Sequence, residues 1–456
     1  MAAKADRTEL FETMSIPKAV ATLSVPMVLS SLVMVLYNLA DTYFVGMLND
    51  PIQNAAVTLA YPVLLAFNAV NNLFGVGSSS MMSRSLGAGD HEKVRQASTF
   101  GVYGAIFTGL LFSFCVFTFN TPLLKLLGTE EITLAPTREY LFWTTVMGAA
   151  PAILNVVIAQ LVRAEGSPLH ASVGTMSGCI LNIILDPFFI LPFGLNMGAA
   201  GAGLATFISN CFACLYFFVL IIKRKNNTYV CLDIRRFTLK PDVVVPIVTV
   251  GIPAAIQNLL NVTGTTILNN FTSSYGANAV AAMGIAQKVT MIPTQMVLGV
   301  SQGVMPLVGY NYASGNVKRM KDALYFTTGI AMVLILGVTA GLWIWAPDLI
   351  KVFLDNPDIV RMGSTFLHGL ALSLPFTTID FTGIGVFQAV GLGKHALFFA
   401  ILRKIILEIP CLFILNKLFP LTGLAYARTV AEAGVSVAAV ITLSGIFRKL
   451  KQKQTN

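Results

Sequence analysis

The chain has 456 residues, of which 55% belong to the hydrophobic set and only 11% are charged. Soluble domains carry about 25% charged residues, so this composition excludes an ordinary soluble protein and indicates an integral membrane protein. The formal net charge is +9, but the basic residues lie mainly between the apolar stretches, so the charge gives no case for nucleic-acid binding.

The first 18 residues are polar and charged, without the apolar core and cleavage site of a removable signal peptide. Apolar stretches then follow one another along the chain. Each reaches the roughly 20 residues that a membrane helix needs, and none shows the roughly 10-residue alternation of barrel strands. We therefore expect an all-α integral membrane protein with twelve transmembrane helices, near residues 19–46, 55–83, 97–120, 138–162, 169–191, 198–222, 243–271, 279–307, 323–346, 361–388, 395–416 and 421–447.

Lys and Arg are unevenly distributed between the two sets of loops that these spans define. The segments on the side of the termini carry 21 of the 30 basic residues, and those on the opposite side carry five. Cytoplasmic loops are rich in Lys and Arg, so the bias predicts that both termini lie in the cytoplasm.

Two halves of the chain repeat each other. "SLGAGDHEKVRQA" at 85–97 aligns with "NYASGNVKRMKDA" at 311–323, and "RAEGSPLHA" at 163–171 aligns with "QAVGLGKHA" at 388–396. Because each copy holds six spans, we expect two six-helix bundles related by a pseudo-twofold axis along the membrane normal. The predicted parts are a cytoplasmic N-terminus at 1–18, an N-terminal lobe at 19–222, a basic cytoplasmic linker at 223–242, a C-terminal lobe at 243–447 and a cytoplasmic tail at 448–456.

Two carboxylates lie within the spans of the first half. Asp41 follows Tyr37 by four residues on the first span, and Asp186 follows Asn182 by four residues on the fifth. A charge at the bilayer centre costs roughly 2.5–3.5 kcal/mol on insertion scales, so such a group usually faces a cavity and has a partner. Thr206, on the sixth span, falls at a similar depth, and each i, i+4 pair shares one helical face.

These groups suit a small cation or a proton. Carboxylate, amide and hydroxyl oxygens are hard donors of the kind that Na⁺ prefers. Alternatively, one carboxyl group binds a proton, because burial and a neighbouring negative charge both disfavour its ionised form. The alternative is a purely structural role, in which Asp186 only ends its helix before Pro187 and Asp41 lies among the lipid headgroups.

Polar residues of the second half follow another pattern. Asp380 takes the repeat position of Asn155, where it could draw cationic compounds into a central cleft, and Lys288 either lines that cleft or snorkels to the membrane surface. The seventh span has Gln257, a candidate residue of the same cleft, but no acid. The remaining charges form i, i+4 pairs that we interpret as structural contacts between helices, a cluster of Arg403, Lys404, Glu408, Arg428 and Glu432.

Several segments together resemble the multidrug and toxic compound extrusion (MATE) family. They are "PMVLSSLVMVLYNLADTYFVGML" at 26–48, the repeat motifs at 83–97 and 309–323, "NIILDPFFI" at 182–190 and "GAAGAGLATFIS" at 198–209. The resemblance covers essentially the whole chain, and "FQAVGLGKHAL" at 387–397 is similar to the MepA-like bacterial branch.

The resemblance implies a secondary antiporter of the bacterial cytoplasmic (inner) membrane. Such a protein exports organic cations and other amphipathic drugs in exchange for H⁺ or Na⁺, by alternating access of two lobes. It implies no cofactor beyond the coupling ion, and we expect a monomer surrounded by membrane lipid. The residues that match the family's cation site and its surroundings are Asp41, Asn182, Asp186, Thr206, Tyr37 and Asn155.

A lipid or lipid-linked oligosaccharide flippase is the alternative, because such proteins share the general fold. A flippase should have extra spans or a strongly basic cavity, and the candidate cleft is neutral to acidic in the first half. An enzyme is not expected, because the sequence has no HExxH, GxSxG or paired-aspartate metal motif.

Overall fold

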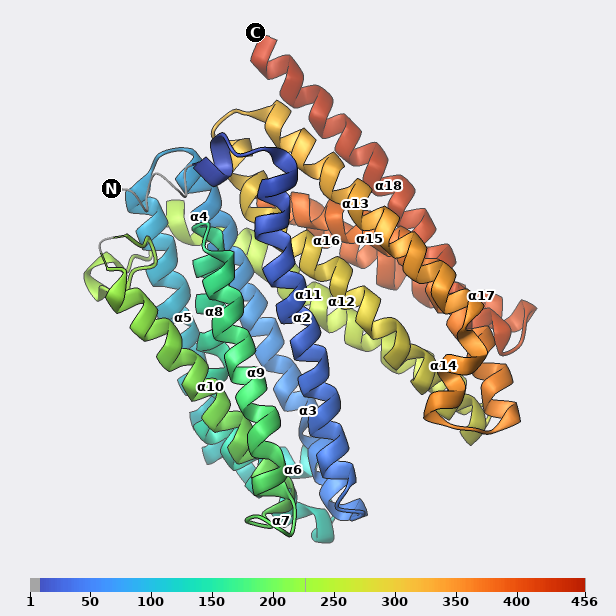
Figure 1. Ribbon diagram of the computed structural model, residues 1–456. Coiled ribbons are helices and arrows are strands. Elements are labelled where there is room, and N and C mark those ends of the chain that lie inside the picture. Colours follow the sequence, from blue (N-terminus) through green and yellow to red (C-terminus); the bar gives the residue numbers. More distant parts are fainter. Residues whose placement is uncertain (1–8, 226, 456) are drawn as a thin grey trace. The chain divides into compact units, whose positions relative to one another are not determined.

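The computed structural model describes residues 9–225 and 227–455, and every regular element among them is helical (Figure 1). Within these residues, 10 helices are long and apolar enough to cross a membrane. A bent pair, Glu131–Met147 with Ala149–Ala164, brings the number to 11. The prediction of an all-α membrane protein is confirmed.

The first six predicted spans each correspond to one helix or to a run of helices. A short helix, α6 (Asn120–Leu126), lies between the third and the fourth. The spans are α2 (Ile16–Gly46); α3 (Pro51–Asn71), the π-helical η1 (Asn72–Val76) and α4 (Gly77–Gly87); α5 (His91–Thr118); α7 (Glu131–Leu141), the π-helical η2 (Phe142–Met147) and α8 (Ala149–Ala164); α9 (Pro168–Ile190); and α10 (Gly198–Lys223).

The second half begins after a linker whose one regular element is the short 3₁₀-helix η3 (Ile234–Arg236). A short helix, α14 (Ala346–Phe353), precedes the tenth span. The spans are α11 (Pro241–Ser273); α12 (Ala277–Ala313); α13 (Val317–Ile344); α15 (Pro357–Ala389); α16 (Gly393–Ile401), the π-helical η4 (Leu402–Glu408) and α17 (Ile409–Leu418); and α18 (Thr422–Thr455).

The eleventh predicted span, residues 395–416, is helical but is not among the helices that are long and apolar enough to cross a membrane. The predicted span at 395–416 contains three charged residues, Arg403, Lys404 and Glu408. All three lie on η4, where the π-helical turn interrupts the α-helix. The difference therefore arises from a buried polar site within the span.

The chain forms two compact units. Unit 1 contains residues 1–13 and 29–255, and unit 2 contains residues 14–28 and 256–456. The unit boundaries fall inside α2 and α11, whereas the lobes predicted from the repeat begin and end between spans. The lobe boundaries at 19–222 and 243–447 stay a prediction.

The repeated motif folds in the same way in both copies. Gly89 and Gly315 adopt φ values of 75° and 78°, which glycine reaches without a Cβ penalty. The residue that follows each of them caps the next helix. Asp90 accepts a hydrogen bond from the Lys93 backbone N at 3.1 Å, and Asn316 accepts one from the Arg319 backbone N at 3.1 Å. The shared turn and cap explain why this stretch is similar in the two halves.

Unit 1 is held together by close helix contacts. Figure 1 shows α8, α9 and α10 running side by side, in agreement with their packing. A Cβ added at Gly174 of α9 would lie 2.4 Å from the Phe217 ring and 2.8 Å from the Tyr216 ring, both on α10. Small residues let membrane helices approach closely, and here the missing side chain makes room for two aromatic rings.

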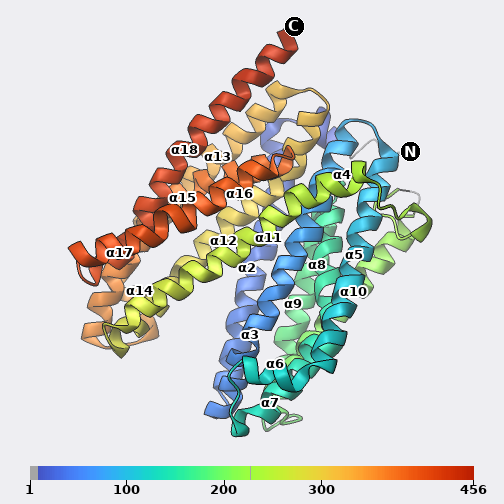
Figure 2. The same ribbon diagram turned by 180° about the vertical axis from the view of Figure 1, so that it is seen from behind.

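Unit 2 uses hydroxyl groups for the same purpose. In Figure 2, α15 and α18 lie against each other, in agreement with their packing. Thr429 of α18 donates to the Gly369 carbonyl at 2.8 Å, and Ser436 donates to the Phe376 carbonyl at 2.9 Å. These two bonds lie seven residues apart along both helices, so the helices keep one register over two turns.

Candidate functional site

Asp186 lies at the centre of a polar site in unit 1. Its side chain is fully buried on α9, and Asn182 lies one turn before it on the same face. With the Asn182 amide oriented to satisfy both of its groups, its nitrogen donates to Asp186 Oδ2 at 2.9 Å and its oxygen accepts from the Thr206 backbone N at 3.1 Å. In the opposite orientation the nitrogen lies 3.3 Å from Thr206 Oγ1. Asn182 therefore joins α9 to α10 in either case.

Two residues of α2 complete the acidic site. Asp41 is close enough to Asp186 for the two carboxylates to interact electrostatically, and its buried Oδ1 has no hydrogen-bond partner. The Tyr37 hydroxyl interacts with the Thr206 side chain and with both carboxylates. Thus Asp41, Asn182, Asp186, Thr206 and Tyr37, predicted as a group, come together from three helices. Their oxygen atoms offer a set of hard donors.

Tyr140 also belongs to this neighbourhood. It is buried on α7 and interacts electrostatically with Asp41, Tyr37 and Asp186. Its position in the sequence does not predict this contact, because Arg138 and Glu139 directly before it mark the edge of the fourth predicted span. The one sequence feature that could have indicated a role for Tyr140 is its position within one helical turn of the charged residues at the start of the span.

Asn155 makes its contacts elsewhere in unit 1. Its amide nitrogen donates to Asn210 Oδ1 at 2.9 Å and to the Pro151 and Ala152 carbonyls at 3.1 and 3.2 Å. Asn210 lies on α10, four residues after Thr206 and therefore on the same helical face. Asn155 thus fastens α8 to the helix that carries Thr206, which makes it a positioning residue at one remove from the carboxylates.

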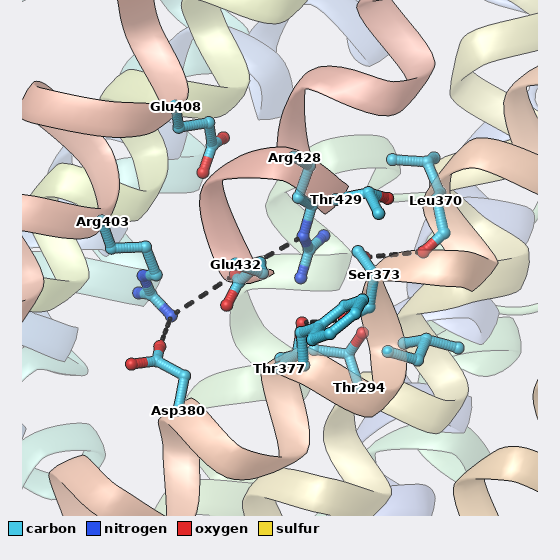
Figure 3. A network of polar contacts seen from close by, with 12 residues as sticks. Thr294, Leu370, Ser373, Thr377, Asp380, Arg403, Glu408, Arg428, Thr429 and Glu432 are labelled. Atoms are coloured by element: carbon cyan, nitrogen blue, oxygen red, sulfur yellow. Dashed lines mark hydrogen bonds and ion pairs between the residues drawn. The ribbon is translucent and has the colours of Figure 1, made fainter. Parts of the chain in front are cut away.

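Unit 2 contains a network of six charged side chains, of which five are buried and Arg428 is 27% exposed, and Figure 3 shows four of the six joined in a row. Arg403 Nη1 lies 3.0 Å from Asp380 Oδ2 and 4.0 Å from Glu432 Oε1, while Arg428 Nε lies 3.8 Å from the same Glu432 atom. Arg403 also donates to Asn261 Oδ1 at 2.6 Å. Lys404 Nζ reaches both Glu408 oxygens, at 2.6 and 2.8 Å. The network holds three basic and three acidic groups.

The placement of Asp380 corrects the grouping made from sequence. Asp380 was set apart as a cleft residue, and the structure places it inside the predicted charge cluster, fully buried against Arg403. The i, i+4 pairs Lys404–Glu408 and Arg428–Glu432 were visible in the sequence, and both are present. Asp380 and Arg403 lie 23 residues apart on different helices, and only the fold brings them together.

Comparison with known proteins identifies the family. The MatE family model matches residues 26–188 and 253–414, which is most of both halves. The chain belongs to the MatE family. The multidrug export protein MepA of Staphylococcus aureus strain MSSA476 is 34% identical over 96% of both chains, and that of Staphylococcus haemolyticus strain JCSC1435 is 34% identical over the same shares.

A solved structure of an outward-facing multidrug resistance MATE family transporter of the MOP superfamily is 26% identical, with a TM-score of 0.91 over 97% of this chain and 98% of that one. A MATE in complex with MaL6 gives the same TM-score and identity over 97% and 99%. The chain therefore has the fold of MatE-family transporters, in keeping with the expected twelve helices in two bundles. The relatives do not favour the flippase alternative.

Two further predicted residues lie in unit 2. Gln257 is half-buried on α11 and accepts a hydrogen bond from Gln388 of α15 at 3.2 Å. Lys288 is exposed on α12. Neither belongs to the charge network, and their predicted roles at a substrate cleft stay predictions for this MatE-family chain.

Proposed function

We propose that this MatE-family transporter exports cationic and amphipathic drugs in exchange for H⁺ or Na⁺. The observation that carries the proposal is a charge imbalance in unit 1. Among the residues that the structure describes, no basic side chain lies within ion-pair distance of Asp41 or Asp186. Asp186 is fully buried and Asp41 is half-buried, and two neighbouring carboxylates in such surroundings without a basic partner favour a bound proton or a bound metal cation. The names of the multidrug export relatives support a drug as the substrate.

Each residue of the site has a distinct part in this proposal. Asp186 and Asp41 bind the coupling ion, and Asn182 holds Asp186 in place through the bond at 2.9 Å. Thr206 supplies a hydroxyl oxygen from α10. Tyr37 presents an aromatic ring one turn from Asp41, which a flat organic cation can stack against.

Drug and ion compete in this arrangement. A proton or Na⁺ on the carboxylates removes the negative charge that attracts a cationic drug, and linkage requires that the drug weaken ion binding to the same extent. An inward ion gradient therefore drives the drug outward when the two lobes alternate in access. The site supports either ion, because carboxyl groups serve both.

The charge network of unit 2 has a structural part in the proposal. Its three acids are matched by three bases at distances between 2.6 and 4.0 Å, so it needs no ion from outside. The basic-residue bias supports cytoplasmic termini, and we propose that the transporter lies in the bacterial inner membrane as a monomer, as the family resemblance implies.

Transport in liposomes tests the proposal. Purified protein should move ethidium when a pH or sodium gradient is imposed, and Asp186→Asn should abolish this transport while the protein still folds. Asp355→Asn is the matched control, because it removes one acid that is 73% exposed in its side chain. Ethidium movement without either gradient, or unchanged transport by Asp186→Asn, would disprove ion-coupled antiport through this site.

A further inference from the structure

A groove opens on the outer surface of unit 1 between α9 and α10. It has a volume of about 360 Å³ and lies at the end of α10 that leads into the basic linker. Its lining includes His170 of α9 together with Phe212, Leu215, Tyr216, Val219 and Lys223 of α10. Leu215 follows Thr206 by nine residues, or two and a half helical turns, so the groove lies on the opposite face of α10 from the acidic site.

The length of the groove matches one leaflet of a bilayer. From Phe212 to Lys223 the helix advances 11 residues, which at 1.5 Å per residue is about 16 Å. The hydrocarbon core of a bilayer is about 30 Å thick, so the groove extends over about half of it. Phe212, Leu215 and Val219 are 46%, 58% and 41% exposed, and they form a continuous apolar track along this length.

The groove is polar at its end near the C-terminus of α10. His170 Nδ1 lies 3.1 Å from the Tyr216 hydroxyl, and the hydroxyl also interacts with Arg224. The Tyr216 ring can take this position because Gly174 leaves room for it. Tyrosine, with an apolar body and a polar tip, is typical of the membrane interface.

Two basic residues, Lys223 and Arg224, lie at the end of α10 that borders this polar part of the groove. Within the described part of the chain, neither Lys223 nor Arg224 forms an ion pair. By contrast, Arg236 of the same linker pairs with Glu92. An apolar track of one-leaflet length that ends at two unpaired cations complements a lipid with an anionic headgroup.

We propose that this groove is a binding site for an anionic phospholipid of the leaflet at the basic end of α10, which the predicted topology makes the cytoplasmic leaflet. One acyl chain lies along Phe212, Leu215 and Val219. The phosphate lies between Lys223 and Arg224, beside the Tyr216 hydroxyl. A cationic drug does not fit this site, because the two basic residues repel it.

The charge supplies the selectivity of the site. An acyl chain leaves one apolar surrounding for another, so the track alone does not distinguish lipids. Each Lys or Arg near a membrane surface strengthens the attraction of an anionic headgroup about fivefold. Two such residues give an expected preference of about 25-fold for an anionic over a zwitterionic headgroup.

Native mass spectrometry of the full-length protein in detergent tests the proposal. Phosphatidylglycerol and phosphatidylcholine with identical acyl chains are titrated, and the wild type should retain phosphatidylglycerol about 25-fold more tightly. The double variant Lys223→Gln, Arg224→Gln should lose this preference. The matched control is Lys225→Gln, Lys240→Gln, which removes the same charge from exposed positions of the same linker and should keep it.

Filling the groove separates a lipid from a bare anion. Val219→Trp should weaken retention of both lipids while it leaves the basic residues in place, and inorganic phosphate should not displace phosphatidylglycerol. Equal retention of the two lipids by the wild type, or equal losses in the two double variants, would overturn the proposal. A protein dimer that Val219→Trp dissociates would overturn it too, because a second copy would then occupy the groove.

Discussion

The buried ion pair between Asp380 and Arg403 leads to a strong prediction about stability. Arg403→Gln removes the positive charge that lies 3.0 Å from Asp380, where the two side chains are 2% and 0% exposed. It also weakens the hydrogen bond to Asn261 at 2.6 Å. The Asp380 carboxylate then remains in the interior without its main partner, and its second oxygen, Oδ1, already has no hydrogen bond.

The expected loss is large because both side chains are buried. Breaking a buried ion pair by removing one partner typically costs about 3–5 kcal/mol in the free energy of unfolding. Lys351→Gln is the matched control, because Lys351 lies 3.8 Å from Asp355 with both side chains exposed, at 59% and 73%. Loss of an exposed pair costs about 1 kcal/mol or less.

A double-mutant cycle measures the pair itself. Denaturant titration of the detergent-solubilised protein gives the unfolding free energy of Arg403→Gln, Asp380→Asn and the double variant. The double variant should be more stable than the sum of the two single losses predicts, with a coupling of about 0.5–3 kcal/mol. If it folds, it should keep ion-coupled ethidium transport. The structural interpretation would be refuted by two results together. Arg403→Gln would lower the free energy of unfolding no more than Lys351→Gln does, and the double variant would lose ion-coupled ethidium transport.

Three further predictions concern the charged sites. Drug affinity of the wild type should fall about 5- to 150-fold as pH falls or sodium rises through the range in which the acidic site binds its ion, since the ion removes the negative charge that attracts the drug. Asp186→Asn should flatten this dependence in a fluorescence binding titration. Wild-type affinity that is independent of both pH and sodium would place ion coupling at another site. Asp41→Asn should abolish gradient-driven efflux in cells at normal expression, so near wild-type drug resistance would remove Asp41 from the mechanism. Glu408→Gln leaves Lys404 buried without its acidic partner, so it should lower expression or thermal stability and leave the stoichiometry of ion exchange unchanged. A changed stoichiometry at normal stability would make Glu408 a coupling residue.

The positions of the spans could be predicted because bilayer thickness fixes the length of an apolar helix. The interruptions could not. The fourth span is bent by 48° between Met147 and Ala149, after the π-helical turn η2, whose residues are as apolar as those of a regular helix. The turn at η4 has the same geometry although it carries Arg403, Lys404 and Glu408, so composition does not distinguish the two turns from a regular helix. A π-helical turn adds one residue to a helical turn without a composition of its own, so the sequence pattern does not reveal it.

The site was predictable to the extent that its contacts are local. Residues four apart on a helix share a face, which is why Tyr37 with Asp41, and Asn182 with Asp186, could be paired from the sequence. Tyr140 approaches them from α7, and no spacing rule connects helices that are distant in the chain.

The two halves differ in how their buried carboxylates are balanced, and this difference assigns their roles. In unit 2 the acids Asp380, Glu408 and Glu432 have basic partners from the same unit, so a change in external pH or sodium meets a network that is already neutral. In unit 1 Asp186 accepts a hydrogen bond from the Asn182 amide, and Asp41 lies near Tyr37; neither an amide nor a neutral phenol cancels the charge of a carboxylate. A bound ion therefore changes the net charge of unit 1 far more than that of unit 2. Since a ligand can shift a conformational equilibrium only through its different affinity for the two states, we expect an ion gradient to act on unit 1, where Asp41 and Asp186 form no ion pair among the described residues.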